Sequence, residues 1–432
     1  MTAEPKQLQM RMAFISREYP PSARAGGIAS YVWECAHWLV DHGHEVYVIA
    51  ASDDVSAEFE YTEQGVHVAR LAGGDFFIGS SHSIVNTVRS LVRRLLCHRS
   101  YRRRVADKLQ KLVDAGLVDL VEFPEYGDEA LVWAERTLGH PWVVRLHTPA
   151  IFDRRTGKKR SWISSPLTRW RGRSELVTLY KADAITSCSQ SLADVVRDLS
   201  PRSAHGILVV PNAVAVDRWL FQPHHAAQAA SGDPPKVHTI FSAGSIVAEK
   251  GYGELVEAAR LLRGRGLEVQ LVLAGKHGTL GRSLVSLVTT KSEYQGWLTL
   301  PGALPRQELA SRYSSADLVV FPSWWEAFGL VCVEAMAASA LVLGSSEGGM
   351  REIIEDGSDG FLIKPRDPVA LADKIQSIIN LPEETRARVR RAANESARMR
   401  FEVGRVMERQ VAFYREVIQL HAKRRLIRGQ ST

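Results

Sequence analysis

Short apolar runs alternate along the whole chain with longer stretches of mixed polarity. In the first half these runs read RMAFIS, EVYVIAA, VHVARL, VDLVEFP, WVVRLHT, DAITSC and GILVVPN. In the second half they read HTIFSAGS, VQLVLAG, WLTLPGA, LVVFPS, ALVLGSS and GFLIKP. Runs of this length between helical stretches are typical of repeated βα units, so the pattern predicts parallel sheets and an α/β fold.

Helical spacing of apolar residues marks three further stretches. Residues 28–41 predict a helix that ends before Gly43, a residue suited to the left-handed position after a helix. Residues 84–113 predict a long amphipathic helix, and the pattern from Glu383 onward is helical almost throughout. The apolar side of the long helix consists of Ile84, Val88, Leu91, Leu95, Val105, Leu109 and Leu112. The last segment has a predicted buried stripe of Val406, Phe413, Val417 and Leu420.

Chain length and one irregular segment predict two domains. A chain of 432 residues is too long for one ordinary core. Residues 221–236 are rich in Ala, Pro, Gly and Ser without periodicity, so we interpret them as a linker. We therefore expect Rossmann-like domains at 1–220 and 237–400, and a helical segment at 401–432 that packs back towards the first domain. Ligands of such sheets bind at the carboxyl ends of the strands.

Composition narrows the class of protein. No apolar run approaches the roughly 18 residues of a membrane span, and the start lacks the long apolar region of a signal peptide. The four cysteines lie far apart without a CxxC pair, which argues against a disulfide framework or a zinc site. These features predict a cytoplasmic protein.

The segment FPSWWEAFGLVCVEAMA, residues 321–337, has the most informative pattern. A strand ends near Ser323, Glu326 lies in the following loop, and a helix that contains Glu334 begins near Gly329. Backbone N–H groups of Phe328, Gly329 and Leu330 would then lie at a helix N-terminus, which favours a diphosphate. The two carboxylates can accept hydrogen bonds from sugar hydroxyls. Two solvated glutamates are the alternative, which the strand-to-helix context disfavours.

The pattern S-x-x-E-x-F-G-L-x-x-x-E-A-M-A closely resembles the E-x7-E signature of retaining glycosyltransferases of family 4. The resemblance implies the GT-B fold, in which two Rossmann-like, doubly wound domains face a central cleft. It also implies that Glu326 contacts the donor sugar and that Glu334 binds the nucleotide ribose. Because other segments match in the expected order, the resemblance covers nearly the whole chain.

Three of these segments supply further candidate residues. AGSIVAEKGY, residues 243–252, resembles the family's G-R-L-x-x-x-K-G loop, which implies donor contacts from Gly244, Ser245 and Lys250. Lys250 would stabilise the leaving diphosphate, but Ser245 stands where the family usually has Arg, so one cationic contact is missing or comes from elsewhere. EYPPSARAGGIASYV resembles the family's N-terminal Gly-Gly loop, with Gly26 and Gly27 near the donor phosphate.

His147 ends the run WVVRLHTP, where the family has a histidine beside the transferred sugar. A structural role is the ordinary interpretation of a lone histidine at a strand end, and the resemblance favours the site. The segment GGMREIIEDGSDGFLI matches the family's G-G-x-x-E-I-I block, which implies that Gly348, Gly349 and Glu352 shape the nucleotide pocket.

The resemblance implies a retaining glycosyltransferase that moves a sugar from a UDP- or GDP-sugar to the hydroxyl of a glycan, lipid-linked or small-molecule acceptor. The first domain would bind the acceptor and the second the nucleotide sugar. No cofactor besides this co-substrate and no metal are expected, because Lys250 and a helix dipole can replace a divalent cation. An epimerase or hydrolase with the same cleft, or a non-catalytic sugar-nucleotide-binding protein, are the alternatives. The donor base, the sugar, the acceptor and the oligomeric state stay open.

The formal net charge of +7 is concentrated in two basic stretches of the first predicted domain. Residues 84–113 contain nine Lys or Arg and a single acid, Asp107, and residues 154–173 add a second cluster with Trp162 and Trp170. One interpretation is peripheral docking on an anionic membrane at its inner face, next to a lipid-linked acceptor. The other is a solvated basic face or a pocket for a phosphorylated acceptor. Nucleic-acid binding is not expected, since no recognised module accompanies the charge.

Overall fold

The computed structural model describes residues 9–22, 26–54, 56–73, 84–136, 139–149, 152–153, 158–159, 166–200, 206–220 and 237–429. Side-chain surroundings are described for these residues except 84–97, 153, 158–159, 166–172 and 428–429. The predicted linker at 221–236 lies outside the described residues. The same is true of the side chains of Ile84, Val88, Leu91 and Leu95 and of nearly all those in the second basic stretch.

The first domain is built on an eight-stranded sheet with the order β10-β9-β6-β5-β1-β2-β4-β3. Its strands are β1 Arg11–Ile15, β2 Glu45–Ala51, β3 Phe59–Glu63, β4 Val66–Leu71, β5 Leu120–Pro124, β6 Trp142–Leu146, β9 Ala184–Ser187 and β10 Ile207–Val209. All neighbours are parallel except β3 and β4. A separate antiparallel pair joins β7, Phe152–Asp153, to β8, Lys158–Lys159.

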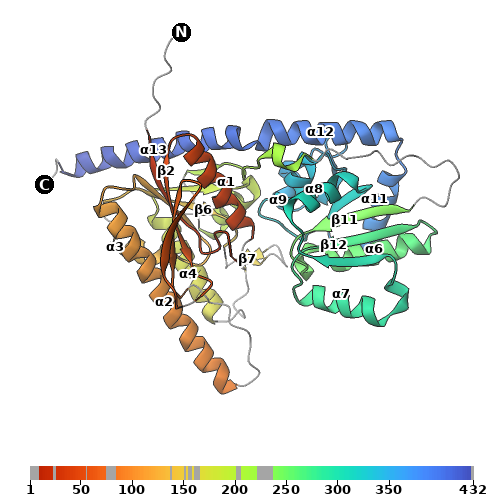
Figure 1. Ribbon diagram of the computed structural model, residues 1–432, viewed down its shortest axis with the longest axis horizontal. Helices are drawn as coiled ribbons and strands as arrows, with labels where there is room; N and C mark the ends of the chain where they lie inside the picture. The colour runs from red at the N-terminus through yellow and green to blue at the C-terminus, as the bar shows by residue number, and fades with distance from the viewer. Residues whose placement is uncertain are drawn as a thin grey trace, which may run out of the picture.

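Helices cover both faces of this sheet (Figure 1). They are α1 Gly27–Asp41, α2 Ile84–Asp114, α3 Leu131–Arg136, α4 Pro166–Lys181 and α5 Gln190–Leu199. Along β1 the side chains alternate: Ala13 and Ile15 belong to the core formed with α2, α3 and α5, whereas Met12 and Phe14 belong to the core formed with α1. This alternation makes the domain doubly wound.

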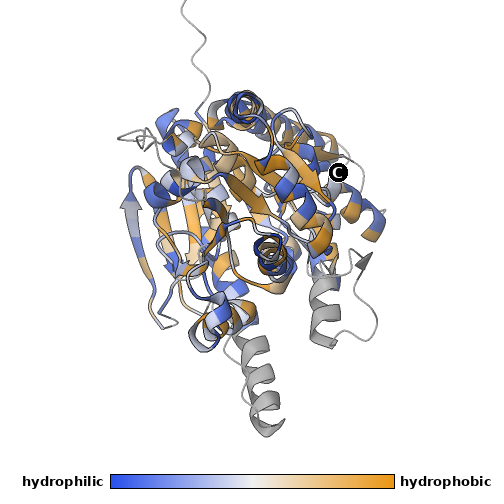
Figure 2. Ribbon diagram, turned by 90° about the vertical axis from the view of Figure 1, so that its right-hand side faces the viewer, coloured by the Kyte–Doolittle hydropathy of each residue, from blue (hydrophilic) through white to orange (hydrophobic). Residues whose placement is uncertain are grey.

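The second domain has a six-stranded parallel sheet with the order β13-β12-β11-β14-β15-β16. Its strands are β11 His238–Ala243, β12 Val269–Ala274, β13 Leu298–Gly302, β14 Leu318–Phe321, β15 Val342–Ser345 and β16 Phe361–Ile363. Its helices are α6 Tyr252–Gly264, α7 Thr279–Thr290, α8 Arg306–Ser315, α9 Leu330–Ala337, α10 Met350–Ile353, α11 Pro368–Ile379 and α12 Glu383–Phe401. Short 3₁₀ turns are η2 Val216–Trp219, η3 Ala248–Lys250 and η4 Ser292–Tyr294. Figure 2 shows the apolar strands inside the molecule and more hydrophilic helix faces outside.

The last helix, α13 Val403–Gly429, crosses from the second domain to the first (Figure 1). At the crossing, Val214 N–H donates to the Phe401 carbonyl (2.9 Å) and Val403 N–H donates to the Val214 carbonyl (3.1 Å). Four residues of α13 complete the first domain's core on the α1 side: Met407, Val411, Tyr414 and Val417. Of the predicted stripe, Val406 and Val417 are buried, Phe413 is half-buried and Leu420 is exposed. This face of α13 turns away from the sheet towards the C-terminal end of the helix.

The predicted fold class is confirmed, and every predicted strand is present. The hairpin β3–β4 was missed, because FEYTE is an exposed edge strand without an apolar run. Its turn residues Gln64 and Gly65 both have positive φ, which matches the right-handed twist of a hairpin. None of the helices described is long and apolar enough to cross a membrane.

The long helix α2 agrees with the prediction to within one residue, and Val105, Leu109 and Leu112 are buried as expected. Part of its basic charge is neutralised within the domain. Arg102 forms a buried ion pair with Asp128 (2.6 Å), and Lys108 pairs with Glu60 of β3 (2.6 Å). Arg99 and Arg103 are exposed.

Candidate active site between the two domains

A cavity of about 760 Å³ lies between the two domains, at the carboxyl ends of both sheets. Its lining includes eleven of the candidate residues singled out from the sequence: Gly26, Gly27, His147, Gly244, Ser245, Lys250, Glu326, Phe328, Gly329, Leu330 and Glu334. The candidates Gly348, Gly349 and Glu352 are not part of it. They come from segments more than 300 residues apart in the chain, from Gly26 to Glu334. The structure thus brings the candidate residues to one place, as expected where strands of facing sheets end.

Gly26 and Gly27 form the start of α1 on the first domain's wall. Gly26 is the residue before the helix, in extended backbone, and no side chain caps this end. A Cβ added to Gly27 would meet nothing within 4 Å. Both glycines line the cavity, so the start of the helix, with the N–H groups that have no partner within the helix, lies at its wall.

His147 lies directly after β6 on the same wall. Its backbone N–H donates to both carboxylate oxygens of Glu125 (2.8 Å each), and Thr148 N–H donates to Glu125 Oε1. The imidazole ring meets Tyr31 of α1 edge to face, with 5.6 Å between ring centroids. Burial, together with the nearby Arg145 guanidinium, lowers the pKa of His147 to about 3, so the ring is neutral near pH 7.

Glu125, whose carboxylate accepts the hydrogen bonds from the His147 backbone, was not predicted from the sequence as a site residue. The residue is fully buried, and burial raises its pKa to about 7 although backbone N–H groups favour the carboxylate. A signal was present in VDLVEFPE, because an acid at the end of a buried strand needs a partner.

A buried polar network lies behind this wall. Glu122 of β5 accepts hydrogen bonds from the hydroxyls of Tyr31 (2.9 Å) and Tyr414 (2.6 Å). Arg145 of β6 lies over the Tyr31 ring, with its Cζ 4.6 Å from the centroid. The Arg145 guanidinium also donates to Asn212 Oδ1 (2.8 Å), and Asn212 lines the cavity. The network fixes β5, β6, α1 and α13 relative to one another.

The second domain's wall is charged. Lys250, at the end of η3, forms an ion pair with Glu326, whose carboxylate also accepts a hydrogen bond from Ser323 Oγ (2.9 Å). Glu326 is 7% exposed. Among the described residues that line the cavity, Lys250 is the only Lys or Arg. No cation therefore stands in for the family arginine at Ser245 in that part of the lining.

Glycines behind this wall fix the loop of Glu326. Gly348 forms a backbone bridge with Glu326, and Gly349 N–H donates to the Glu326 carbonyl (2.8 Å). Gly348 has φ +72°, and a Cβ there would lie 2.2 Å from the Glu326 carbonyl oxygen. These two glycines therefore position Glu326 from behind. Glu352 does not line the cavity, so its expected place in the nucleotide pocket was wrong; its carboxylate turns towards α5 instead.

Helix α9 begins at the floor of the cavity. Gly329 precedes its first residue with φ +108°, and no side chain caps this end. The N-terminal N–H groups and the helix dipole make this a favourable place for an anion. Glu334, one turn along the helix, also faces the cavity. Burial raises its pKa to about 7, with Arg306 opposing the shift and Glu34 adding to it.

Within the described part of the chain, no three His, Cys, Asp or Glu side chains come together in a way that could hold a metal ion. The described features that could interact with an anion are Lys250 and the helix starts at Gly26 and Gly329.

Two doubly wound domains with their strand ends facing a shared cavity define the GT-B class of glycosyltransferases. Residues 25–218 match the family model Glycosyltransferase Family 4, and residues 224–396 match Glycosyl transferases group 1. The chain therefore belongs to the family described by these two models, the group 1 or family 4 glycosyltransferases, and it is a glycosyltransferase.

Individual proteins agree with this assignment. The glycogen synthase of Mycobacterium tuberculosis is 27% identical over 399 residues, which span 89% of each chain. The sucrose-phosphate synthase of Thermosynechococcus elongatus has a similar structure, with a TM-score of 0.74 over 95% of this chain and all of that chain at 20% identity. HepE from Anabaena, solved in complex with UDP and glucose, gives a TM-score of 0.67 over 94% of this chain and all of that chain at 17% identity.

Proposed function

We propose that the enzyme transfers a sugar from a nucleoside-diphosphate sugar to an acceptor hydroxyl, with retention of the anomeric configuration and without a metal ion. The observation that supports this most strongly is the composition of the interdomain cavity. One wall combines Lys250, two carboxylates and an uncapped helix start, and the other combines an uncapped helix start with a neutral histidine.

The second wall is suited to the departing nucleotide. As the bond between the anomeric carbon and the diphosphate oxygen breaks, its electron pair and negative charge pass to the diphosphate. Lys250 and the N–H groups at the start of α9 would stabilise that charge where it develops. Glu334 would accept hydrogen bonds from the ribose hydroxyls, and Glu326 from the donor sugar. These roles take the place that a divalent cation has in other transferases.

Retention follows if the acceptor attacks from the face that the diphosphate leaves. The acceptor oxygen forms the new bond to the anomeric carbon, and its proton passes to the departing phosphate oxygen. Within the described lining, Glu18 is the only carboxylate that the first wall provides. His147, which is neutral, would hold a sugar hydroxyl rather than transfer the proton.

The donor is proposed to be a UDP- or GDP-sugar. HepE from Anabaena binds UDP on the same fold, which supports a uridine nucleotide as the first to test. Contact with an anionic membrane through residues 84–113 and 154–173 stays a prediction, supported by exposed Arg99 and Arg103 on α2. Flotation with anionic vesicles at low salt tests it, and no binding would leave a soluble acceptor.

The first experiment is a thermal-shift screen against UDP, GDP, ADP and their sugar conjugates, with and without EDTA. A ligand that binds only the native state must raise the melting temperature. We expect one base to give a clear shift that EDTA does not change and that Glu334→Ala abolishes. A shift that disappears in EDTA would contradict metal independence.

Product analysis separates the proposed transferase from its alternatives. NMR of the product formed with a hydroxyl acceptor should show the anomeric configuration of the donor. An inverted anomer would overturn retention. Free sugar or an epimer formed without acceptor would favour the hydrolase or epimerase alternative, and nucleotide binding without turnover would favour a non-catalytic protein.

A further inference from the structure

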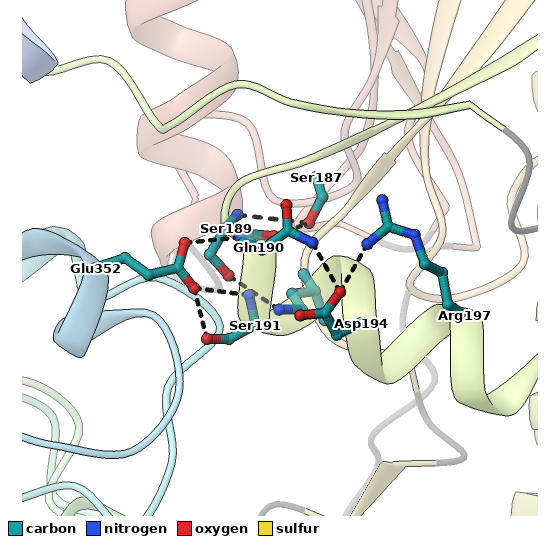
Figure 3. A network of polar contacts seen from close by, with 8 residues as sticks. Ser187, Ser189, Gln190, Ser191, Asp194, Arg197 and Glu352 are labelled. Carbon is teal, nitrogen blue, oxygen red and sulfur yellow. Dashed lines mark hydrogen bonds and ion pairs between the residues drawn. The ribbon is translucent and has the colours of Figure 1, made fainter.

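The N-terminus of α5 in the first domain is capped twice, once from each domain (Figure 3). Ser189, the residue before the helix, accepts a hydrogen bond from Leu192 N–H (3.1 Å), which is an ordinary serine cap. The N–H groups of Gln190 and Ser191 are left over in the first turn. Both donate to the carboxylate of Glu352 in the second domain, at 2.7 and 2.6 Å.

The second cap combines the negative charge of Glu352 with several hydrogen bonds to the start of the helix. The Ser191 hydroxyl also donates to Glu352, and it approaches the Gly348 carbonyl at 3.1 Å. A carboxylate with three donors at the positive end of a helix dipole gains both hydrogen bonds and favourable electrostatics. Helix α5 starts directly after β9, so the contact joins the strand ends of one sheet to the other domain.

Glu352 lies on the same short segment that holds Glu326. Gly348 and Gly349, four and three residues before Glu352, form the backbone bridge and hydrogen bond to Glu326. On the far side, the Arg400 guanidinium of α12 donates to the carbonyls of Ile353 (2.7 Å) and Glu352. The segment is therefore fixed at both ends within the second domain, and the Glu352 side chain reaches out of it.

A second contact across the domain boundary involves the residue next to Glu326. Ser189 Oγ donates to the carbonyl of Ala327, the residue after Glu326. The start of α5 thus touches the Glu326 loop directly at Ala327 and indirectly through Glu352. Any shift of α5 relative to the second domain would move the His147 wall relative to Glu326.

We infer that Glu352 is a positioning residue, which caps α5 across the domain boundary and so sets the alignment of the two walls during transfer. Gln190 is exposed, and Ser191 and Glu352 are half-buried, so water can replace these bonds and the contact can break and re-form. The role in transfer rests on the proposed function, whereas the cap itself does not.

The chain offers a matched control. Asp367 caps α11 within the second domain by accepting hydrogen bonds from Val369 N–H (3.0 Å) and Ala370 N–H (2.9 Å). Glu352→Gln and Asp367→Asn each remove one negative charge at a helix N-terminus, but only the first spans the domain boundary. Glu352→Asp keeps the charge on a shorter side chain.

The test combines kinetics, UDP binding and hydrogen exchange on the full chain. We expect Glu352→Gln to lower kcat by about 10- to 100-fold, since small misplacement of reacting groups is costly. UDP affinity should change less than about 2-fold, because most of the proposed nucleotide contacts belong to the second domain. Glu352→Asp should recover part of the lost rate, and Asp367→Asn should match the wild type.

Hydrogen exchange provides the second readout. Exchange of the Gln190 and Ser191 amides should accelerate at least about 10-fold in Glu352→Gln and remain unchanged in Asp367→Asn. Wild-type kcat in Glu352→Gln, or UDP binding weakened as much as kcat, would overturn the positioning role. Unchanged exchange would overturn the cap, and this arm remains decisive even if the wild type transfers no sugar and the proposed function fails.

Discussion

The two walls of the cavity follow the same architectural plan but differ in charge. In each, the segment that follows a strand begins a helix at an uncapped glycine, at Gly26 in the first domain and Gly329 in the second. The second wall adds the Lys250–Glu326 ion pair and Glu334, whereas the first adds the neutral His147 above a buried Glu125. Under the proposed function, we expect the second domain to provide most of the binding of the charged donor, and the first domain mainly to shape the cavity and orient the substrates.

Removal of the charge on the second wall should have the largest effect. Lys250→Ala is expected to lower kcat about 10²- to 10³-fold, because the developing diphosphate charge loses its cation. Initial rates at saturating donor measure this. Lys291→Ala removes an exposed lysine of the same domain and should keep the wild-type rate. A loss of less than about 3-fold in Lys250→Ala would remove the proposed asymmetry between the walls.

Substitution of a glycine behind the same wall should have the second largest effect on activity. Gly348→Ala is expected to lower kcat about 10- to 100-fold, because its Cβ would collide with the Glu326 backbone and displace the carboxylate. Gly357 also has positive φ (+80°), but a Cβ there meets nothing within 4 Å. Gly357→Ala should therefore lose only about 1 kcal/mol of stability and no activity. Equal loss of activity in both variants would show that strain alone, and not the Glu326 loop, is responsible.

Donor affinity should depend on pH through Glu334. Because burial raises its pKa to about 7, the group is mostly protonated at pH 6 and mostly ionised at pH 8. An ionised carboxylate accepts hydroxyl hydrogen bonds more strongly, so UDP affinity should rise up to about 10-fold across that range. Calorimetric titrations at the two pH values measure the change. Glu334→Gln should bind weakly at both, and a variant that keeps the wild-type pH dependence would assign it to another group.

The smallest effect is expected on the first wall. His147→Asn should reduce kcat by no more than about 10-fold, the range of one neutral hydrogen bond. Since the pKa of His147 is lowered to about 3, the ring does not titrate between pH 5 and 9, and the variant should keep the shape of the wild-type pH–rate profile. A step near pH 6 that is present in the wild type and lost in the variant would show that this wall also bears charge.

The apolar runs predicted the fold because buried parallel strands need continuous apolar sequence, which is rare elsewhere in the chain. The same reasoning could not find β3, which is exposed and pairs only along one edge. Candidate residues were found because they lie in segments that follow strands and that resemble family motifs, both of which can be read from sequence. Glu125, Arg145 and Asn212 were missed, since their contacts join three separate strand ends and become visible only when the chain is folded.

Glu352 illustrates a different limit. Its segment was correctly associated with the site, because Gly348 and Gly349 hold Glu326 from behind. The direction of its side chain depends on how the second domain lies against α5, and no local pattern encodes that relation. The domain limits proposed from sequence stay predictions.

The path of α13 also has a consequence for biosynthesis. This last helix supplies Met407, Val411 and Val417 to the core of the domain that is synthesised first, and Tyr414 to its buried Glu122. While the second domain is still being translated, α13 is absent, and the part of the first domain's apolar core that it covers stays exposed. Chaperones commonly bind nascent chains in such a state. A fragment that ends at residue 220 would keep that uncovered face permanently. A unit that contains the first sheet with its core complete therefore includes α13.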